Sequence, residues 1–428
     1  MDRTLGATIR PVETQPQIDV VTFGCRLNAY ESQVMKDLAT NAGLSDTVII
    51  NTCAVTSEAE RQARQVIRKL RRERPGARIM VTGCAVQVSP EKWAAMAEID
   101  RVLGNTEKMQ QESWLIDGPR VAVGDIMTVR ETAIHMIDGF AAKTRSFIEI
   151  QQGCDHRCTF CIIPFGRGNN RSVPLGDIVN QVQRLVDNKV TEVVLTGVDI
   201  TGYGSDLPGQ SSLGQMIRRL LTQVPELKRL RLSSIDVAEA ARDEALWELI
   251  ANEPRLMPHL HLSLQSGDDL ILKRMKRRHL RKDAIAFAAS AQAMRPDLVL
   301  GADFIAGFPT ETEEAFARTL DIVDACNLSL LHVFPFSARE GTPAARMKAL
   351  PKTVIRERAA RLRKKGEQAL QSCLERQMGR NVNVLIETQG EGRTENYLPA
   401  RVLAPSNQTG VVSGKVIGCE NNRLQVKA

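Results

Sequence analysis

The sequence lacks the features that would place the protein in a membrane or outside the cell. No apolar stretch among its 428 residues approaches the roughly 20 residues that a membrane helix needs. The opening segment MDRTLGATIRPVETQPQ has no apolar core of a signal peptide, so we expect a loose leader and a cytoplasmic protein. No stretch is both strongly amphipathic and rich in aromatic residues, which disfavours a membrane surface as partner. In a reducing compartment, nine cysteines are not expected to form a disulfide framework.

The chain does have the composition of an ordinary globular protein, with 43% hydrophobic and 25% charged residues, and it is long enough for two or three domains. Its net charge of +7 is unevenly placed, because residues 61–78 hold eight basic residues and one acid. Further basic runs lie at 273–282 and 352–365. A single run could be a solvated helix face. Three runs together indicate an anionic partner, and nucleic acid fits better than membrane.

The first domain, which we delimit as residues 17–125, alternates strand and helix patterns. Continuous apolar runs predict buried parallel strands at 18–24, 47–51 and 78–83. The segments between them have helical patterns, and the second helix opens with Ser57 and Glu60 in the spacing of a capping box. This alternation predicts a doubly wound α/β domain with a parallel sheet.

A second strand–helix series follows a linker near 124–145 and defines a domain at 140–370. Its strands are predicted at 147–152, 192–197, 229–234, 259–264, 298–305 and 330–336. Six βα units predict an incomplete (β/α)6 barrel with its site at the carboxyl ends of the strands. Residues 373–428 alternate polar and apolar residues between glycine turns, which predicts a small all-β barrel of OB-like type. A basic helix at roughly 352–378 joins the two.

Six cysteines form two groups of three. One group, the CxxxCxxC triple, lies in the string GCDHRCTFC and consists of Cys154, Cys158 and Cys161. The other, the strand-end triple, directly follows the three strands of the first domain and consists of Cys25, Cys53 and Cys84. Because the carboxyl ends of parallel strands meet at one edge of a sheet, we expect the strand-end triple to converge. The other three cysteines match no motif and are interpreted as structural: Cys326, Cys373 and Cys419.

Three thiolates without a fourth ligand favour an iron–sulfur cluster over zinc. A structural zinc site closes four positions, and His156 is too crowded inside the CxxxCxxC triple to complete one easily. A [4Fe–4S] cluster held by three cysteines instead leaves one iron open for a small molecule. A non-catalytic RNA-binding protein with zinc in both triples is the alternative, and metal analysis would separate the two.

The CxxxCxxC triple, with Phe160 before its last cysteine, resembles the motif of the radical S-adenosylmethionine (SAM) enzymes. The resemblance implies that SAM chelates the open iron and that its reductive cleavage gives a 5′-deoxyadenosyl radical. TGVDI resembles the glycine-rich motif of these enzymes, and GADFIAGFP resembles the motif beside the adenine. Together with other polar strand ends, these motifs predict cofactor contacts from Thr196, Gly197, Asp199, Ser233, Ser234, Gln265, Ser266, Gly307 and Arg339.

Nearly the whole chain resembles the radical SAM methylthiotransferase family. The resemblance rests on TFGCRLNAYES, NTCAVT and TGCAVQ, on GCDHRCTFCIIPFGRGNNRS, and on GRTENYLPARV in a C-terminal TRAM domain. It implies that the CxxxCxxC triple holds the radical cluster and that the strand-end triple holds an auxiliary [4Fe–4S] cluster that carries or donates sulfur. One SAM then methylates that sulfur, and a second generates the radical that activates a C–H bond.

Within the family, GCRLNAYES and IIPFGRGNNRS resemble the branch that modifies N6-threonylcarbamoyladenosine in tRNA. The resemblance implies methylthiolation at C2 of adenosine 37 in the anticodon loop. The branches that act on N6-isopentenyladenosine in tRNA or on a ribosomal-protein aspartate are alternatives, as is a radical enzyme whose second cluster only relays electrons.

We expect Arg26 either to pair with the threonyl carboxylate or only to brace its loop, and we expect tRNA phosphates on Arg68, Arg71 and Arg72. The remaining partners are a sulfur donor and a reduced electron donor such as flavodoxin or ferredoxin.

Overall fold

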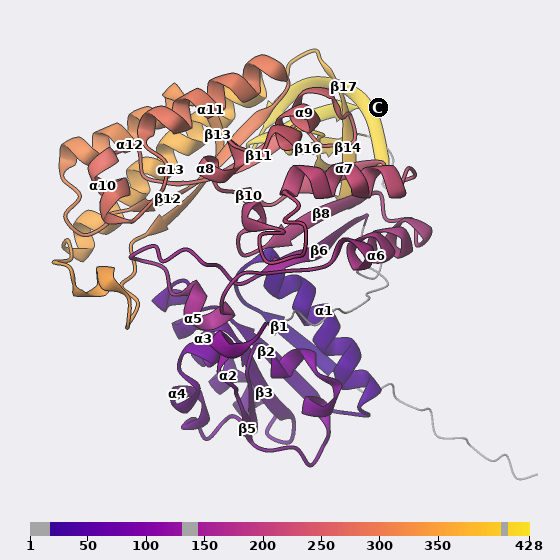
Figure 1. The fold of residues 1–428 in the computed structure, drawn as a ribbon, viewed down its shortest axis with the longest axis vertical. Helices are drawn as coiled ribbons and strands as arrows, with labels where there is room; N and C mark the ends of the chain where they lie inside the picture. Colours follow the sequence, from indigo (N-terminus) through magenta and orange to yellow (C-terminus); the bar gives the residue numbers. More distant parts are fainter. Residues whose placement is uncertain (1–17, 131–143, 404–409) are drawn as a thin grey trace, which may run out of the picture.

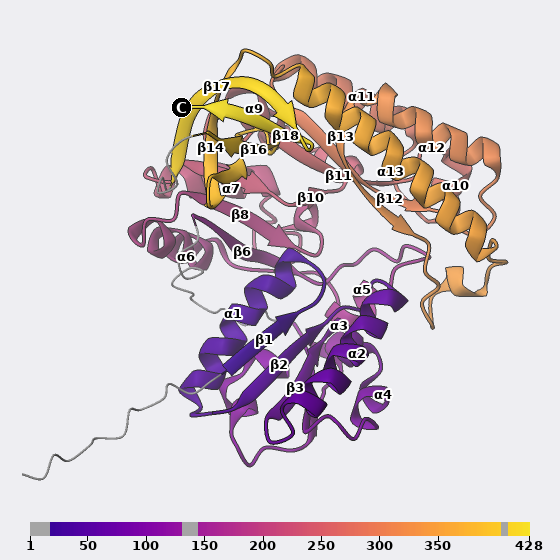
Figure 2. The same cartoon turned by 180° about the vertical axis from the view of Figure 1, so that it is seen from behind.

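The computed structural model describes residues 18–130, 144–403 and 410–428 (Figure 1). The leader expected at 1–17 and most of the linker expected at 124–145 lie outside these residues. An N-terminal sheet lies at one end of the molecule, an open barrel follows it, and a small C-terminal barrel packs on the far side of the open barrel (Figures 1 and 2). Within the described ranges, none of the helices combines the length and the apolar character needed to cross a membrane.

The N-terminal sheet has five parallel strands that follow one another in chain order. They are β1 (Ile18–Thr22), β2 (Thr47–Thr52), β3 (Arg78–Gly83), β4 (Arg101–Leu103) and β5 (Val121–Ala122). Helix α1 (Arg26–Asn41) covers the face that carries Ile49, and α2 (Ser57–Glu73) with α4 (Pro90–Ala94) covers the face that carries Val48 and Ile50. Both faces are therefore buried, which explains the continuous apolar runs and confirms the predicted parallel sheet between helices.

Helix α2 begins at Ser57, but the predicted capping box is wrong. The cap is Thr56, whose hydroxyl accepts the N–H of Ala59 at 3.2 Å. The Ser57 hydroxyl instead lies 3.1 Å from that of Ser337, which comes from the end of the open barrel, and Glu60 also pairs across this boundary. The start of α2 is thus part of an interface with the barrel.

The open barrel consists of two four-stranded sheets joined through one residue, Ser233. Its strands are β6 (Arg145–Gln152), β7 (Arg171–Ser172), β8 (Glu192–Gly197), β9 (Arg229–Leu232), β10 (Ser234–Ile235), β11 (His259–Gln265), β12 (Val299–Ala306) and β13 (Leu328–Pro335). All pair in parallel except β7, a short antiparallel neighbour of β6. In the described part of the chain no ladder joins β13 to β6, so the barrel is open on that side, as predicted.

Helices cover the outside of the barrel. The longer ones are α6 (Leu175–Asp187), α7 (Leu213–Gln223), α9 (Glu244–Asn252), α11 (Arg281–Met294) and α12 (Glu313–Ala325). Short helices follow the strands at the site edge: α3 (Cys84–Val88) in the N-terminal sheet, then α5 (Ile163–Arg167), α8 (Val237–Ala240) and α10 (Asp269–Arg274). The long basic helix α13 (Lys352–Glu375) packs along β13 and leads to the last part of the chain.

The C-terminal part is a closed five-stranded barrel, as predicted. Its strands are β14 (Asn381–Thr388), β15 (Glu391–Arg393), β16 (Pro399–Val402), β17 (Val411–Glu420) and β18 (Arg423–Lys427). The last strand, β18, was not among the predicted strands, yet it closes the barrel by pairing with both β16 and β17.

A buried carboxylate, Glu192, organises the contact between the two barrels. It receives hydrogen bonds from three arginines at the starts of neighbouring strands, Arg145 at 2.6 Å, Arg229 at 3.0 Å and Arg231 at 2.9 Å. Burial alone would raise the pKa of Glu192, but the arginines, Arg231 foremost, lower it to about 2. Arg231 also donates to the carbonyl of Glu395 at 3.0 Å, so the same network holds the C-terminal barrel in place.

Replacing Glu192 with alanine should lower the free energy of unfolding by about 3–5 kcal/mol, because it leaves buried guanidinium groups without their shared counter-ion. Urea unfolding followed by circular dichroism would measure the change. The control Glu248→Ala removes the partner of Arg218 at the surface and should cost less than about 1 kcal/mol. Similar losses in both variants would contradict the role given to Glu192.

Candidate active site between two cysteine triples

The strand-end triple converges at the carboxyl edge of the N-terminal sheet. Two glycines allow this, because a Cβ at Gly24 would lie 3.0 Å from the Cys53 sulfur, and one at Gly83 would lie 2.3 Å from the carbonyl of Thr52. Both have positive φ angles, +105° and +101°, which favour glycine. Burial, followed by the nearby thiol of Cys84, raises the pKa of Cys53 to about 12.

Arg167, at the end of α5, connects this triple to the barrel. The side chain is 2% exposed, and its Nε donates to the Cys84 sulfur at 3.1 Å. Its Nη2 donates to Asn28 at 2.6 Å and to Glu31 at 2.9 Å. Glu31 also binds Lys108 at 2.6 Å, and both of these side chains are fully buried. Burial would raise the pKa of Glu31, but Arg167 and then Lys108 lower it to about 2, so it remains a carboxylate.

The CxxxCxxC triple lies in the loop between β6 and α5. The N–H of Cys161 donates to the carbonyl of Cys158 at 3.0 Å, and that of Cys154 donates to Gly168 at 3.0 Å, so the loop folds back on itself. Arg277 donates to the Cys158 sulfur at 3.6 Å. Burial, followed by the Cys158 thiol, raises the pKa of Cys161 to about 12. The three thiols therefore lie close enough to influence one another.

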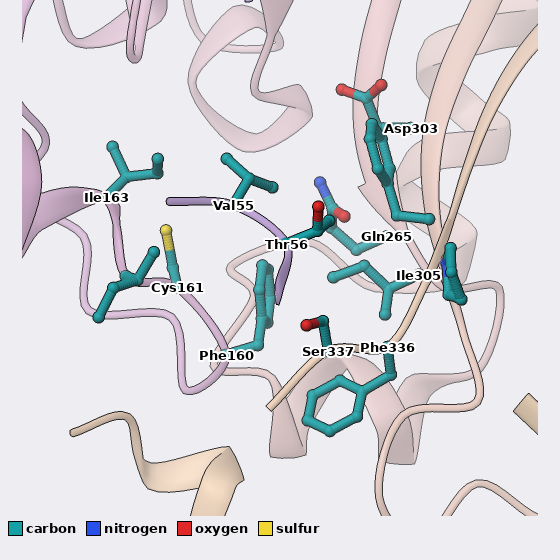
Figure 3. A pocket seen from close by; sticks show the side chains of 13 residues that line it. Val55, Thr56, Phe160, Cys161, Ile163, Gln265, Asp303, Ile305, Phe336 and Ser337 are labelled. Atoms are coloured by element: carbon teal, nitrogen blue, oxygen red, sulfur yellow. The ribbon is translucent and has the colours of Figure 1, made fainter. Parts of the chain in front are cut away.

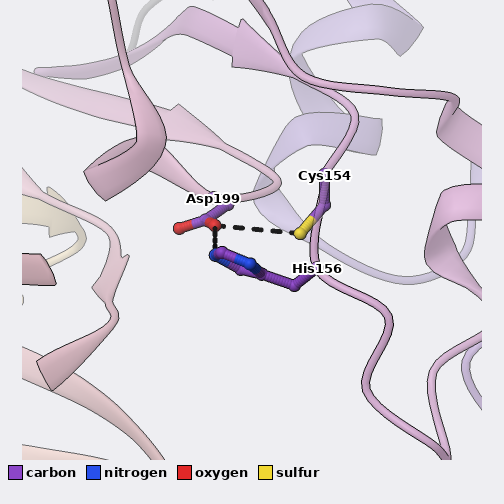
Figure 4. Close-up of side chains that lie close together, drawn as sticks. All are labelled: Cys154, His156 and Asp199. Atoms are coloured by element: carbon purple, nitrogen blue, oxygen red, sulfur yellow. Dashed lines mark hydrogen bonds and ion pairs between the residues drawn. The ribbon is translucent and has the colours of Figure 1, made fainter. Parts of the chain in front are cut away.

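His156 faces two carboxylates in this arrangement. Its Nε2 lies 2.9 Å from Asp199 (Figure 4) and 3.5 Å from Glu239, and these two carboxylates raise its pKa to about 10. Asp199 Oδ2 also accepts from the Cys154 sulfur at 3.7 Å. The ligand atoms of Cys154, His156 and Asp199 all lie within 4.8 Å of one another, and the raised pKa of His156 favours a donor role toward the carboxylates.

A cavity lies beside Cys161 where the barrel meets the segment that follows Cys53, and we call it the interdomain cavity (Figure 3). One wall holds Cys161 with the apolar side chains beside it, and Val55 and Thr56, which follow Cys53, come from the N-terminal sheet. The opposite wall comes from the ends of β11, β12 and β13. Gln265 reaches the cavity from a β-bulge with a φ of +68°, and such strain at a strand end is typical of a binding site.

Some of the predicted cofactor residues lie near this cavity. Gln265 lines it, and the Ser234 hydroxyl lies 3.5 Å from Asp303, another lining residue. Asp199 lies beside Cys154, while Thr196 is buried at the end of β8. A Cβ at Gly197 would lie 2.7 Å from the carbonyl of Gln151, so only glycine allows this turn next to β6.

Other predicted cofactor residues have different surroundings. The Ser266 hydroxyl is fully buried against Thr319, and Ser233 is buried between the two halves of the barrel. Gly307 packs against Ile355 of α13, where a Cβ would come within 2.8 Å. None of these three lines the cavity.

Arg339 is nine-tenths buried and pairs with Glu60 of α2, so its structural surroundings indicate a contact between the N-terminal sheet and the barrel. Burial lowers its pKa. The sequence indicated other roles for both residues, and no local pattern joins them, since 279 positions separate them.

The arginines predicted to bind RNA divide into two kinds. Arg68 and Arg72 are exposed on the outer side of α2, and the contact of Arg68 with Glu98 is long, at 3.7 Å. Arg71 instead donates to the carbonyls of Pro75 at 2.9 Å and Ala77 at 2.8 Å and pairs with Asp100 at 2.6 Å. Arg71 is thus committed to the fold of its own domain.

The site depends on residues that sequence spacing did not identify. Arg167, Asn28 and Glu31 lie within the family-like strings, but 136 positions separate Arg167 from Glu31, so no local pattern joins them. Arg277 belongs to a basic run expected to bind phosphates, yet it bonds to Asp236 at 2.7 Å and to the Cys158 sulfur.

Both donor sets fit [4Fe–4S] clusters. Burial raises the pKa of Cys53 in one triple and of Cys161 in the other, and a metal ion supplies the positive charge that favours thiolates. Two of the remaining cysteines, Cys326 and Cys373, are buried in the cores of the open barrel and the C-terminal barrel, and Cys419 packs against the latter core. Each triple therefore offers three sulfur atoms as candidate cluster ligands, and the interdomain cavity lies beside Cys161.

Two family models match the chain. The model described as Radical SAM superfamily matches residues 148–323, and the model described as Uncharacterized protein family UPF0004 matches residues 17–104. Among solved structures, the radical S-adenosylmethionine methyltransferase TsrM from Kitasatospora setae, with cobalamin and a [4Fe-4S] cluster bound, superposes with a TM-score of 0.54 at 14% identity, over 77% of this chain and 74% of its own. This likeness shows the fold.

Three curated relatives match nearly the whole chain. "Threonylcarbamoyladenosine tRNA methylthiotransferase MtaB" from Rickettsia prowazekii is 52% identical over 95% of this chain and 96% of its own length. The protein of the same name from Aquifex aeolicus is 34% identical, with 88% and 94% covered. The "tRNA-2-methylthio-N(6)-dimethylallyladenosine synthase" of Cereibacter sphaeroides is 32% identical, with 92% and 91% covered. The chain therefore belongs to the radical SAM methylthiotransferase family, whose members use [4Fe–4S] clusters and SAM.

Proposed function

We propose that the chain methylthiolates N6-threonylcarbamoyladenosine in tRNA, at C2 of adenosine 37 in the anticodon loop. The observation that supports this most is the position of the interdomain cavity, which Cys161 lines on one side and Val55 and Thr56 line on the other. A substrate carbon in this cavity would lie between the two cysteine triples. That position suits a reaction that needs a radical from one side and sulfur from the other.

In this proposal the CxxxCxxC triple holds the radical [4Fe–4S] cluster, and the strand-end triple holds the auxiliary cluster that supplies sulfur. SAM on the first cluster supplies the carbon-centred radical. The chain's own part is to position and to exclude water. Apolar side chains such as Phe160, Ile305 and Phe336 line the cavity, and Gln265 and Asp303 offer hydrogen bonds within it.

The contacts of the predicted cofactor residues support a binding role for some of them and a structural role for others. We assign Asp199 and Gln265 to the cofactor or substrate, because they lie beside Cys154 and in the cavity wall. We assign Gly197 to the turn that brings Asp199 there, since both N–H groups after it, those of Val198 and Asp199, donate to Gln151 at 2.9 and 2.8 Å.

The substrate assignment is supported by the names of the relatives, since the two that are named for threonylcarbamoyladenosine share 52% and 34% identity with the chain. The relative named for dimethylallyladenosine shares 32%, so that nucleoside is the alternative substrate. Arg26, directly after Cys25, gives a reason to prefer an acidic nucleoside. A guanidinium binds a carboxylate, which the threonyl group has and a dimethylallyl group lacks.

The proposed partners follow from the reaction. Exposed Arg68 and Arg72 on α2 would contact tRNA phosphates. A reduced flavodoxin or ferredoxin would supply electrons to the cluster on the CxxxCxxC triple, and a separate donor would replace the sulfur. We place the reaction in the cytoplasm, where the tRNA is.

Deleting the gene should remove 2-methylthio-N6-threonylcarbamoyladenosine from bulk tRNA, and its precursor without the methylthio group should accumulate. Mass spectrometry of nucleosides from cells with and without the gene would measure both. Restoring the gene should restore the product. An unchanged nucleoside profile would exclude a tRNA substrate in those cells, and ribosomal proteins would then be analysed for a missing methylthio group.

Cysteine substitutions in the two triples should have different effects on the reaction. Cys158→Ala should abolish formation of 5′-deoxyadenosine and of product, whereas Cys53→Ala should keep some SAM cleavage and form no methylthiolated product. Each variant should fall from about eight to about four irons per chain, because each cubane has four. Cys419→Ser, in the C-terminal barrel, is the control and should keep its iron. Product from Cys53→Ala would show that the auxiliary role is wrong.

Neutralising Arg68 and Arg72 together, both to glutamine, should weaken tRNA binding and reduce the slope of log affinity against log salt by about 1.4–1.8, because two phosphate contacts are lost. Filter binding at several salt concentrations would measure this. The control changes Arg218 and Arg242, which are exposed on the outside of the open barrel, to glutamine. An equal loss in the control would mean that α2 contributes only general positive charge.

A further inference from the structure

A second cavity, of about 360 Å³, opens at the junction of all three parts of the chain. We call it the basic cavity. Arg26 reaches it from the N-terminal sheet, three histidines come from β11 and β13, Arg363 comes from α13, and Arg393 and Tyr397 come from the C-terminal barrel. Its volume is within the range of small-molecule sites. No residue of this cavity other than Arg26 has a role in the function proposed above.

The three arginines of the basic cavity have unused donors. Arg26 donates to the Tyr397 hydroxyl at 3.1 Å, Arg363 donates to the carbonyl of Val333 at 3.3 Å, and Arg393 donates to the carbonyl of Tyr397 at 3.2 Å. Within residues 18–130, 144–403 and 410–428, none of the three forms an ion pair. By contrast, Arg145 and Arg231 nearby share the carboxylate of Glu192. One carboxylate, Glu367, also lines the cavity, against three arginines. A guanidinium has five N–H donors, so the basic cavity still offers unpaired positive charge to an anion.

A buried histidine in the same cavity also has no partner. His259 is 2% exposed, and neither of its ring nitrogens has a hydrogen-bond partner among the described residues. Burial, followed by Arg231, lowers its pKa far below the usual value, so the ring is neutral. It stacks on Tyr397, with 4.8 Å between the ring centroids, and Tyr397 has a strained φ of +68°. This stacked pair, which we call the His259–Tyr397 wall, is part of the cavity lining, and the His259 ring nitrogens are an unused donor and acceptor, which suits a planar polar group.

The basic cavity adjoins the candidate active site through Asp303. This residue lines the interdomain cavity, and its Oδ1 contacts two residues of the basic cavity, His261 at 2.9 Å and His332 at 3.1 Å. Arg26 gives a second connection, because it directly follows Cys25 of the strand-end triple. A molecule whose reacting carbon lies between the triples could therefore extend a side group into the basic cavity.

From these contacts we infer that the basic cavity binds the acidic side group on N6 of the substrate adenosine, with Arg26 and Arg363 on its carboxylate and the His259–Tyr397 wall beside its planar carbamoyl group. This inference rests on the function proposed above. A carboxylate on the base is favoured over an RNA phosphate, because C2 and the carbon that carries N6 belong to the same six-membered ring, whereas the sugar and its phosphates are attached through the five-membered ring. The side group therefore goes deepest into the protein.

The test uses one tRNA in two forms, with the threonyl carboxylate either free or converted to its methyl ester. The enzyme is the full chain with both clusters reconstituted, and mass spectrometry of nucleosides gives kcat and KM for each form. Wild-type enzyme should prefer the free acid by about tenfold or more in kcat/KM, chiefly through KM, because the ester loses charge-assisted hydrogen bonds. In Arg363→Gln the ratio of kcat/KM for the acid to kcat/KM for the ester should fall toward one. The substitution and the esterification together form a double-mutant cycle, in which removal of the arginine removes the effect of the ester.

Two further variants separate the charge from the fold. Arg363→Lys keeps the charge and should keep much of the preference for the acid. Arg356→Gln, exposed on the same helix but outside the cavity, should keep all of it. If Arg363→Gln loses affinity equally for both forms, the contact is with an RNA phosphate and the inference is wrong.

Full preference for the acid in both Arg363→Gln and Arg26→Gln would also overturn the inference, while the proposed function would stand because the wild type still makes product. If wild-type enzyme modifies neither form, the proposed function itself fails. These outcomes are distinguishable in a single set of assays.

Discussion

One buried cation, the guanidinium of Arg167, connects the two halves of the active site. It follows Cys161 by six residues in the chain, and it donates to the sulfur of Cys84 and to Glu31 in the other domain. A charge without access to water is stable only with partners in place, so the loop of the CxxxCxxC triple can fold only with the N-terminal sheet against it. The separation of the two triples is therefore set by a side chain that belongs to neither.

The gap in the open barrel determines from which side a molecule can reach its interior. Because β13 does not pair with β6, the interior remains accessible from one side, and α13 and the C-terminal barrel border that side. Glu192 and its arginines hold the C-terminal barrel at the amino ends of the strands, away from the cysteines. Tyr397 nevertheless reaches Arg26 beside Cys25. The module expected to bind RNA thus contributes a side chain next to the strand-end triple.

The sequence predicted the three-part architecture well, because burial on both faces of the parallel strands leaves a strong apolar signal. It also predicted that Cys25, Cys53 and Cys84 would meet, since the edge of a parallel sheet brings strand ends together whatever the detailed packing. The predictions for individual polar residues were less reliable. Ser266 and Gly307 lie at strand ends, as expected, yet they contact Thr319 and Ile355 instead of a cavity. Periodicity gives the end of a strand but not the direction in which the next side chain points.

Charge was the least reliable guide. Arg71, Arg277 and Arg339 all come from basic or polar segments, and each has a carboxylate partner within the fold. Arg363 of the third basic run donates to the carbonyl of Val333 and forms no ion pair among the residues that the structure describes. By itself, the sequence determined the element order, the two cysteine triples and the iron–sulfur chemistry, because these depend on periodicity and on ligand spacing within short segments. Only the tertiary structure decided which arginines have counter-ions and how the triples face each other, because those facts depend on contacts between residues from 29 to 279 positions apart in the chain.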